Sequence, residues 1–62
     1  MTTYQVCDPV QRDENAKEFA QEARALQEAH QLSKGSAVGI WELEEGNTPV
    51  LICVVVNEQE YW

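Results

Sequence analysis

Basic side chains are scarce in this sequence, which holds 4 Lys and Arg residues against 11 Asp and Glu and has a net charge of −7. DNA, RNA and anionic membrane surfaces would repel such a chain, so the imbalance argues against direct binding to any of them. It favours solubility and leaves open attraction to a basic protein surface. We therefore expect a basic protein partner and neither a nucleic acid nor a membrane.

Long apolar runs and cysteines are also few. The longest apolar run, Val50–Val56, is far too short to span a bilayer, and Met1 is followed by no basic and apolar leader. The two cysteines, Cys7 and Cys53, permit at most one internal bridge. These features predict a cytoplasmic, reduced protein. A length of 62 residues predicts a single domain over 1–62 with one small core.

Motifs of known active sites are missing. The sequence has no phosphate-binding loop, dinucleotide fingerprint, serine-nucleophile motif or calcium loop. The only histidine, His30, has no Ser or Cys at a catalytic spacing. Cys7, Cys53, His30 and Asp8 could converge on zinc, but no pair has the spacing of a recognisable zinc site. We expect no enzymatic activity, no metal and no cofactor.

The segment with the clearest periodicity predicts a helix from about Asp13 to Lys34. Apolar residues recur there at steps of three and four and form one narrow stripe: Ala16, Phe19, Ala20, Ala23, Leu26 and His30. Asp13 would cap the first turn and Gly35 would end the helix. An earlier start with Asp8 as the cap is the alternative, but it would turn Val10 away from the stripe, so we prefer the later start.

Three segments predict β-strands: Thr2–Val6, Ser36–Glu44 and Val50–Asn57. Turn residues between the last two predict a hairpin. The third strand is apolar on both faces, which is typical of a central strand. The predicted fold is therefore α+β with the order β-α-β-β, one long helix packed on a small antiparallel sheet. Its strand order would be 1-3-2, with a possible short fourth strand at the C-terminus, Tyr61-Trp62.

One helix can cover only one face of this sheet, so the other face would expose apolar side chains of the third strand. Depending on register, that face carries either Leu51, Cys53 and Val55 or Val50, Ile52, Val54 and Val56, with Trp41 and Leu43 or Val38 and Ile40 beside them. Both sets are apolar, which favours a homodimer stacked sheet on sheet. The alternative is that the C-terminal aromatics and loop residues fold over this face. We take Leu51, Cys53 and Val55 as the candidate dimer face.

Acidic residues form the one constellation that stands out. On the predicted helix Glu14, Glu18 and Glu22 step by four and would stack along one flank. Like charges at this spacing destabilise a helix, so the ridge is a candidate partner-binding surface, with a merely solvated face as the alternative. Further candidates for partner binding are the acids of the hairpin and the two tryptophans: Glu42, Glu44, Glu45, Trp41 and Trp62.

In size, acidity and compact α+β build, the chain resembles the small inhibitors encoded by phages and other mobile elements, among them anti-CRISPR proteins. The resemblance is one of type and covers no aligned residues. It implies a non-enzymatic inhibitor that occludes the basic, nucleic-acid-binding surface of a partner protein or complex. The alternative is a structural or assembly protein that homodimerises or joins a complex through its apolar sheet face.

Overall fold

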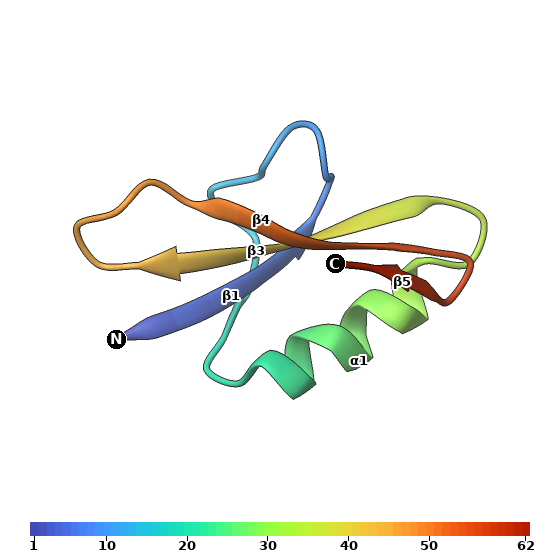
Figure 1. Ribbon diagram of the computed structural model, residues 1–62, viewed down its shortest axis with the longest axis horizontal. Coiled ribbons are helices and arrows are strands. Elements are labelled where there is room, and N and C mark those ends of the chain that lie inside the picture. The colour runs from blue at the N-terminus through green and yellow to red at the C-terminus, as the bar shows by residue number, and fades with distance from the viewer.

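A computed structural model of the chain describes residues 1–62. Its centre is an antiparallel sheet of five strands in the order β2-β1-β3-β4-β5, crossed on one face by a single helix (Figure 1). The elements are β1 (Thr2–Cys7), β2 (Glu18–Phe19), α1 (Glu22–Leu32), β3 (Ala37–Glu44), β4 (Val50–Val56) and β5 (Gln59–Tyr61). Strands hold 42% of the residues and the helix 18%, so the sheet dominates the fold.

The prediction of one long helix on a small three-stranded sheet is therefore wrong. α1 has 11 residues, and residues 8–17 form a loop that leads into β2. The side chain of Gln5 explains the difference. Its Nε2 donates to the backbone oxygens of Glu14 and Ala16, at 3.2 and 2.8 Å. A helix would use these oxygens for amides four residues further along, so the bonds from Gln5 stabilise the loop instead.

Two aspartates shape this loop. Oδ1 of Asp8 accepts the amides of Val10 and Gln11 at 2.7 and 3.0 Å. The Gln11 bond, followed by the Val10 bond, holds the pKa of Asp8 below its ordinary value. Oδ1 of Asp13 accepts the amide of Asn15 at 2.9 Å. Such bonds are also made by helix caps, so both aspartates resemble helix starts in the sequence although they form turns here.

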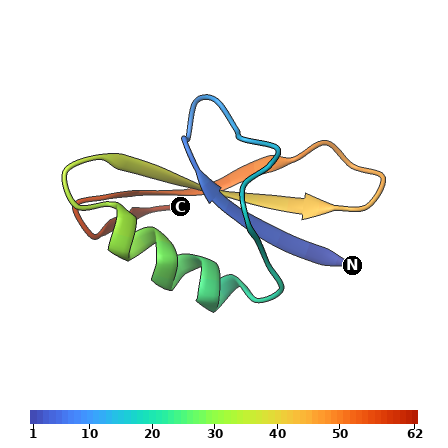
Figure 2. The same cartoon turned by 180° about the vertical axis from the view of Figure 1, so that it is seen from behind.

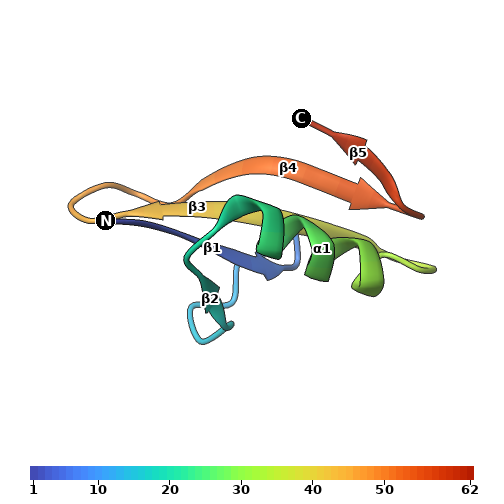
Figure 3. The ribbon, with the colours of Figure 1, turned by 90° about the horizontal axis from the view of Figure 1, so that it is seen from below.

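The predicted strand order 1-3-2 is also wrong, because β3 and not β4 lies at the centre of the sheet (Figure 3). β3 pairs with β1 from Thr2–Glu44 to Cys7–Gly39 and pairs with β4 on its other side. β4 is apolar for a different reason: the helix covers one of its faces, and β5 folds back along Val54–Val56. β4 therefore has the apolar composition that is typical of a central strand, although it lies next to the edge strand β5.

A β-bulge interrupts the pairing of β3 with β4. Ile40 lies opposite Cys53 and Trp41 lies opposite Leu51, so Ile52 has no opposed residue. Side chains alternate between the two faces of a sheet, and residues directly opposed across strands share a face. The extra residue therefore places Leu51 and Cys53 on opposite faces although they are two positions apart.

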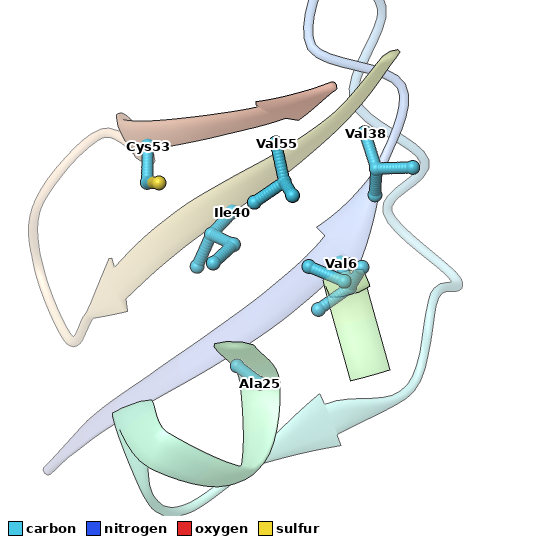
Figure 4. Packing of buried hydrophobic residues seen from close by; sticks show 7 residues of the cluster. Val6, Ala25, Val38, Ile40, Cys53 and Val55 are labelled. Carbon is cyan, nitrogen blue, oxygen red and sulfur yellow. The ribbon is translucent and has the colours of Figure 1, made fainter. Parts of the chain in front are cut away.

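The hydrophobic core lies between the sheet and α1 (Figure 4). Its buried residues are Val6, Ala25, Ala29, Val38, Ile40, Cys53 and Val55. Ala25 and Ala29 lie one turn apart, and their small side chains allow the helix to approach the sheet closely. The predicted stripe is wrong at Ala20 and Ala23, which are exposed, because the helix begins later and turns a different side toward the sheet.

The loop after β1 lies on the face of the sheet opposite α1 (Figures 1 and 2). A Cβ added to Gly39 would lie 2.7 Å from Cα of Pro9 and 2.8 Å from Cδ1 of Leu51. Nε1 of Trp41 donates to the backbone oxygen of Asp8 at 3.1 Å. The loop therefore covers part of the second face of the sheet.

Gly39→Ala should lower the free energy of unfolding by about 1–3 kcal/mol, because the added methyl group overlaps a backbone atom that cannot rotate away. Urea unfolding followed by circular dichroism measures the loss, and Trp41 fluorescence reports displacement of the loop. A variant as stable as the wild type, with unchanged fluorescence, would show that the loop is not held against Gly39.

The turn between β4 and β5 is fixed to the end of α1. The backbone oxygen of the buried Ser33 accepts the amide of Asn57, and its Oγ accepts the amide of Glu58, both at 3.0 Å. Oδ1 of Asn57 accepts the amide of Gly35 at 3.1 Å. Asn57 and Glu58 have φ angles of 48° and 66°, as a two-residue hairpin turn of type I′ requires. These bonds hold β5 next to the helix.

A second contact between α1 and β5 involves Glu60. Its Oε2 lies 2.7 Å from Nε2 of His30, and its Oε1 accepts the indole N–H of Trp62 at 3.1 Å. These two bonds, with His30 the larger cause, hold the pKa of Glu60 below its ordinary value of 4.5. A carboxyl group with a lowered pKa in the folded state stabilises the fold above its unfolded pKa, and that contribution is lost as the pH falls through the folded pKa.

We therefore predict that Glu60→Gln melts below the wild type at neutral pH and that the difference shrinks as the pH falls below about 4.5. Thermal unfolding at stepped pH measures both melting curves. Glu58→Gln is the matched control, because it removes the same charge from an exposed side chain without those contacts, and it should follow the wild type. Parallel pH dependence of Glu60→Gln and the wild type would contradict the prediction.

Candidate acidic binding pocket

The larger of the two hollows in the surface is an acidic pocket with a volume of about 420 Å³. Its walls come from the start of β1, the loop before β2, β2 itself and the turn between β3 and β4. The lining residues are Met1, Thr3, Gln5, Arg12, Glu14, Glu18, Leu43, Glu44, Glu45 and Asn47. Four of the six acids predicted to bind a partner therefore meet at one place, although they come from separate segments.

Hydrogen bonds between neutral and charged side chains organise the wall of the acidic pocket. Gln5 is 1% exposed, and its Oε1 accepts Nη1 of Arg12 at 2.7 Å. Oγ1 of Thr3 donates to Oε1 of Glu18, also at 2.7 Å. The guanidinium group of Arg12 is thus bonded to a neutral amide, and the carboxylate of Glu18 is oriented by a neutral hydroxyl group. The pocket keeps its excess of negative charge.

Apart from Glu60, the carboxylates elsewhere in the protein also lack basic partners. The one ion pair joins His30 and Glu60, and no Lys or Arg nitrogen lies within 4.0 Å of a carboxylate oxygen. Nζ of Lys17 lies 5.2 Å from the centre of the Phe19 ring instead. Because the acids are not neutralised locally, their negative potential extends from the surface into solvent.

The predicted acidic ridge along one helix is wrong. Glu14 lies in the loop, Glu18 in β2, and only Glu22 belongs to α1. The negative charges of Glu22 and Glu42 interact with the hydroxyl group of Tyr4. Tyr4 lies opposite Glu42 in the pairing of β1 with β3. Partial desolvation, followed by the negative charges of Glu22 and Glu42, raises the pKa of Tyr4 above its ordinary value. These two acids are not among the lining residues of the pocket.

The two tryptophans predicted as anchors differ in their surroundings. Trp41 is half-buried, and its indole is bonded to the loop at Asp8. Trp62 is 63% exposed and lies beside Glu60. Of the two, Trp62 offers the larger free surface to a partner, and it does not line the acidic pocket.

The candidate dimer face is divided by the bulge. Cys53 and Val55 are buried beneath α1, at 2% and 0% exposure, whereas Leu51 is 36% exposed on the other face. The three residues therefore do not form one open surface. Cys7 lies opposite Gly39 on the face away from Cys53, and both cysteines are free thiols. Burial raises the pKa of the Cys53 thiol.

No protein-family model, curated protein or solved structure matches this chain. No helix in the structure is long and apolar enough to cross a bilayer. No group of three or more His, Cys, Asp and Glu side chains is placed to hold a metal ion. The activity of the protein is therefore inferred from the acidic pocket and its surroundings.

The residues that shape the pocket without carrying negative charge, Gln5 and Arg12 above all, were not predicted from the sequence. A signal was present in the first strand, where Tyr4 and Val6 point to one face and Thr3 and Gln5 to the other. A long amide on the face away from the helix can bond to whatever segment crosses that face. The helical periodicity of residues 13–34 conceals the segment that crosses this face.

Proposed function

We propose that the protein is a small, non-enzymatic inhibitor that binds a basic protein or complex and occludes its nucleic-acid-binding surface, in the manner of anti-CRISPR proteins. The observation that carries this proposal is the convergence of four carboxylates on one pocket. Glu14, Glu18, Glu44 and Glu45 reach it from the loop, from β2 and from the β3–β4 hairpin. The partner and the inhibitor would meet in the cytoplasm.

The chemistry of the pocket suits an arginine or lysine side chain of the partner. A guanidinium group carries five N–H donors and binds carboxylates through short, charge-assisted hydrogen bonds. The neutral groups of Gln5 and Thr3 hold the loop and Glu18 in place before binding. A preformed site loses less conformational entropy when the partner binds, which increases the affinity.

Occlusion follows from the same charge. Basic residues of the partner that contact successive phosphates of a nucleic acid would contact the carboxylates of the pocket instead. This protein and the nucleic acid would therefore compete for the same surface of the partner. A structural role through an open sheet face has less support, because α1 covers one face and the loop at Pro9 packs on the other.

A charge-reversal variant tests this proposal. Glu14, Glu44 and Glu45 are exposed and their side chains make no hydrogen bond, so replacing all three with Lys should leave the fold intact. The control replaces Glu22, Glu28 and Glu58 with Lys, outside the pocket. Each Glu→Lys change adds two positive charges, so both triple variants carry a net charge of −1.

In affinity capture from host cells, the wild type and the control variant should recover a basic, nucleic-acid-binding protein, and the pocket variant should not. Added double-stranded DNA should displace the captured protein, and rising salt should weaken the binding, because the attraction acts between opposite charges. Equal recovery of the same partner by the pocket variant would exclude the pocket as the interface. A captured partner that DNA leaves bound would exclude occlusion.

A further inference from the structure

The outer edge of β4 is only half covered. β5 pairs with β4 along Val54–Val56 and no further, so the edge from Val50 to Cys53 has no neighbouring strand. An unpaired edge presents backbone N–H and C=O groups that can pair with another strand. Proteins usually protect such edges with charged side chains, proline or bulges. The stretch Val50–Cys53 contains no charged residue, and Pro49 directly precedes it. The bulge at Ile52 is its one irregularity.

Exposed apolar side chains gather beside this edge. The structure exposes seven large apolar residues: Met1, Val10, Leu32, Val50, Leu51, Tyr61 and Trp62. Val50 and Leu51, at 55% and 36% exposure, belong to the open edge itself. Tyr61, at 60% exposure, lies opposite Val54 in the last pair of β5 with β4, and Trp62, at 63%, follows it toward the open stretch. None of these four side chains is charged, in a chain with a net charge of −7.

We propose that a second copy of this chain pairs its own β4 edge with this one, antiparallel and about a two-fold axis near Leu51. Antiparallel pairing of two identical strands satisfies this symmetry, because every contact made by one copy is returned by the other. The aromatic side chains Tyr61 and Trp62 of each copy would lie against Val50 and Leu51 of its partner. The edge is uncharged and so gives a basic partner no electrostatic attraction, whereas it suits an identical apolar edge.

The available area fits a weak, reversible dimer. An aromatic side chain buries about 150–250 Å² when it is fully covered, and each copy offers two that are more than half exposed, together with Val50 and Leu51. Since these side chains are already partly covered, their combined area in two copies falls below the roughly 1,200 Å² of stable specific interfaces, in the range of weak, transient contacts. The domain has only 10 buried residues. A domain with so small a core has a small margin of stability, and association adds buried apolar surface. None of the lining residues of the acidic pocket belongs to the patch, so this dimer does not use the acids of the pocket.

Sedimentation equilibrium of the full chain, from micromolar to millimolar concentration, tests the proposal. The average mass should rise from 7.1 kDa toward twice that value. Val50→Lys should weaken the dimer at least about tenfold, because it puts a hydrated ammonium group where the apolar edge of the partner must pack. Val50 lies opposite Glu42 within the sheet, so a lysine there can pair with that carboxylate and the fold should persist. Val10→Lys, at an apolar position that is 90% exposed in the loop, is the matched control and should dimerise as the wild type does.

Two further measurements identify the interface. Amide exchange at Leu51 and Ile52 should slow as the concentration rises, because pairing protects the backbone. Rising salt should strengthen the dimer, since it screens repulsion between two chains of net charge −7, whereas it should weaken the proposed binding to a basic partner. The two proposals can therefore fail separately. A protein that stays monomeric at millimolar concentration, or a dimer that Val50→Lys leaves unchanged, would overturn this one.

Discussion

Ile40→Ala should lower the free energy of unfolding by about 2–5 kcal/mol, the usual cost of truncating a large aliphatic side chain in a core. Ile40 is fully buried in the central strand, between Val6 on β1 and Cys53 on β4. A domain of this length is stable by only about 3–9 kcal/mol, at roughly 0.05–0.15 kcal/mol per residue. The substitution should therefore leave a substantial fraction of the protein unfolded.

Urea unfolding followed by circular dichroism measures this effect. Ile40→Val should cost only about 0.5–1.5 kcal/mol, because it removes one methylene group and leaves a small cavity. Leu32→Ala provides a second control, at a side chain that is 50% exposed at the end of α1. An equal loss in Leu32→Ala and Ile40→Ala would contradict a core centred on Ile40.

Gln5→Leu should release the loop from the sheet and cost about 1–3 kcal/mol for each buried polar group left without a partner. Leucine has a similar size but cannot donate to the carbonyl oxygens of Glu14 and Ala16 or accept from Arg12. Amide exchange in residues 8–17 should accelerate, and partner binding through the acidic pocket should weaken as its wall becomes mobile.

Gln11→Leu is the control for this prediction. Gln11 lies in the same loop and is exposed, and it contributes its backbone amide rather than its side chain. The Gln11→Leu variant should have the same amide exchange rates in residues 8–17 and the same free energy of unfolding as the wild type. If Gln5→Leu and Gln11→Leu gave the same exchange rates, then Gln5 would not be the residue that holds the loop.

The three long strands and the hairpin could be predicted from the sequence because their causes are local. Alternating side chains indicate β1 and β3, and turn residues separate β3 from β4. The helix could not be bounded in the same way. Residues 13–21 have good helix formers, but helix propensity is a weak preference that tertiary contacts override. Here the overriding contacts come from Gln5, which is 9 and 11 residues away from the oxygens it binds.

The candidate site was predicted in part and for the wrong reason. Helical spacing singles out Glu14 and Glu18, yet the loop and β2 bring them to the pocket. The turn residues after the second strand predict Glu44 and Glu45 to be acids of the hairpin, where the structure does place them. The bulge at Ile52 left no signal in the sequence, because an uninterrupted apolar run has no alternation from which a shifted register can be detected.

The bulge at Ile52 also separates β4 into two parts that can evolve independently. After it, Cys53 and Val55 are confined by the core, so most substitutions there would be removed by loss of folding. Before it, Val50 and Leu51 are partly exposed, so substitutions there should cost less stability than in the core. Lineages of this protein could therefore gain, lose or exchange contacts along one half of a strand while the other half continues to hold the fold together.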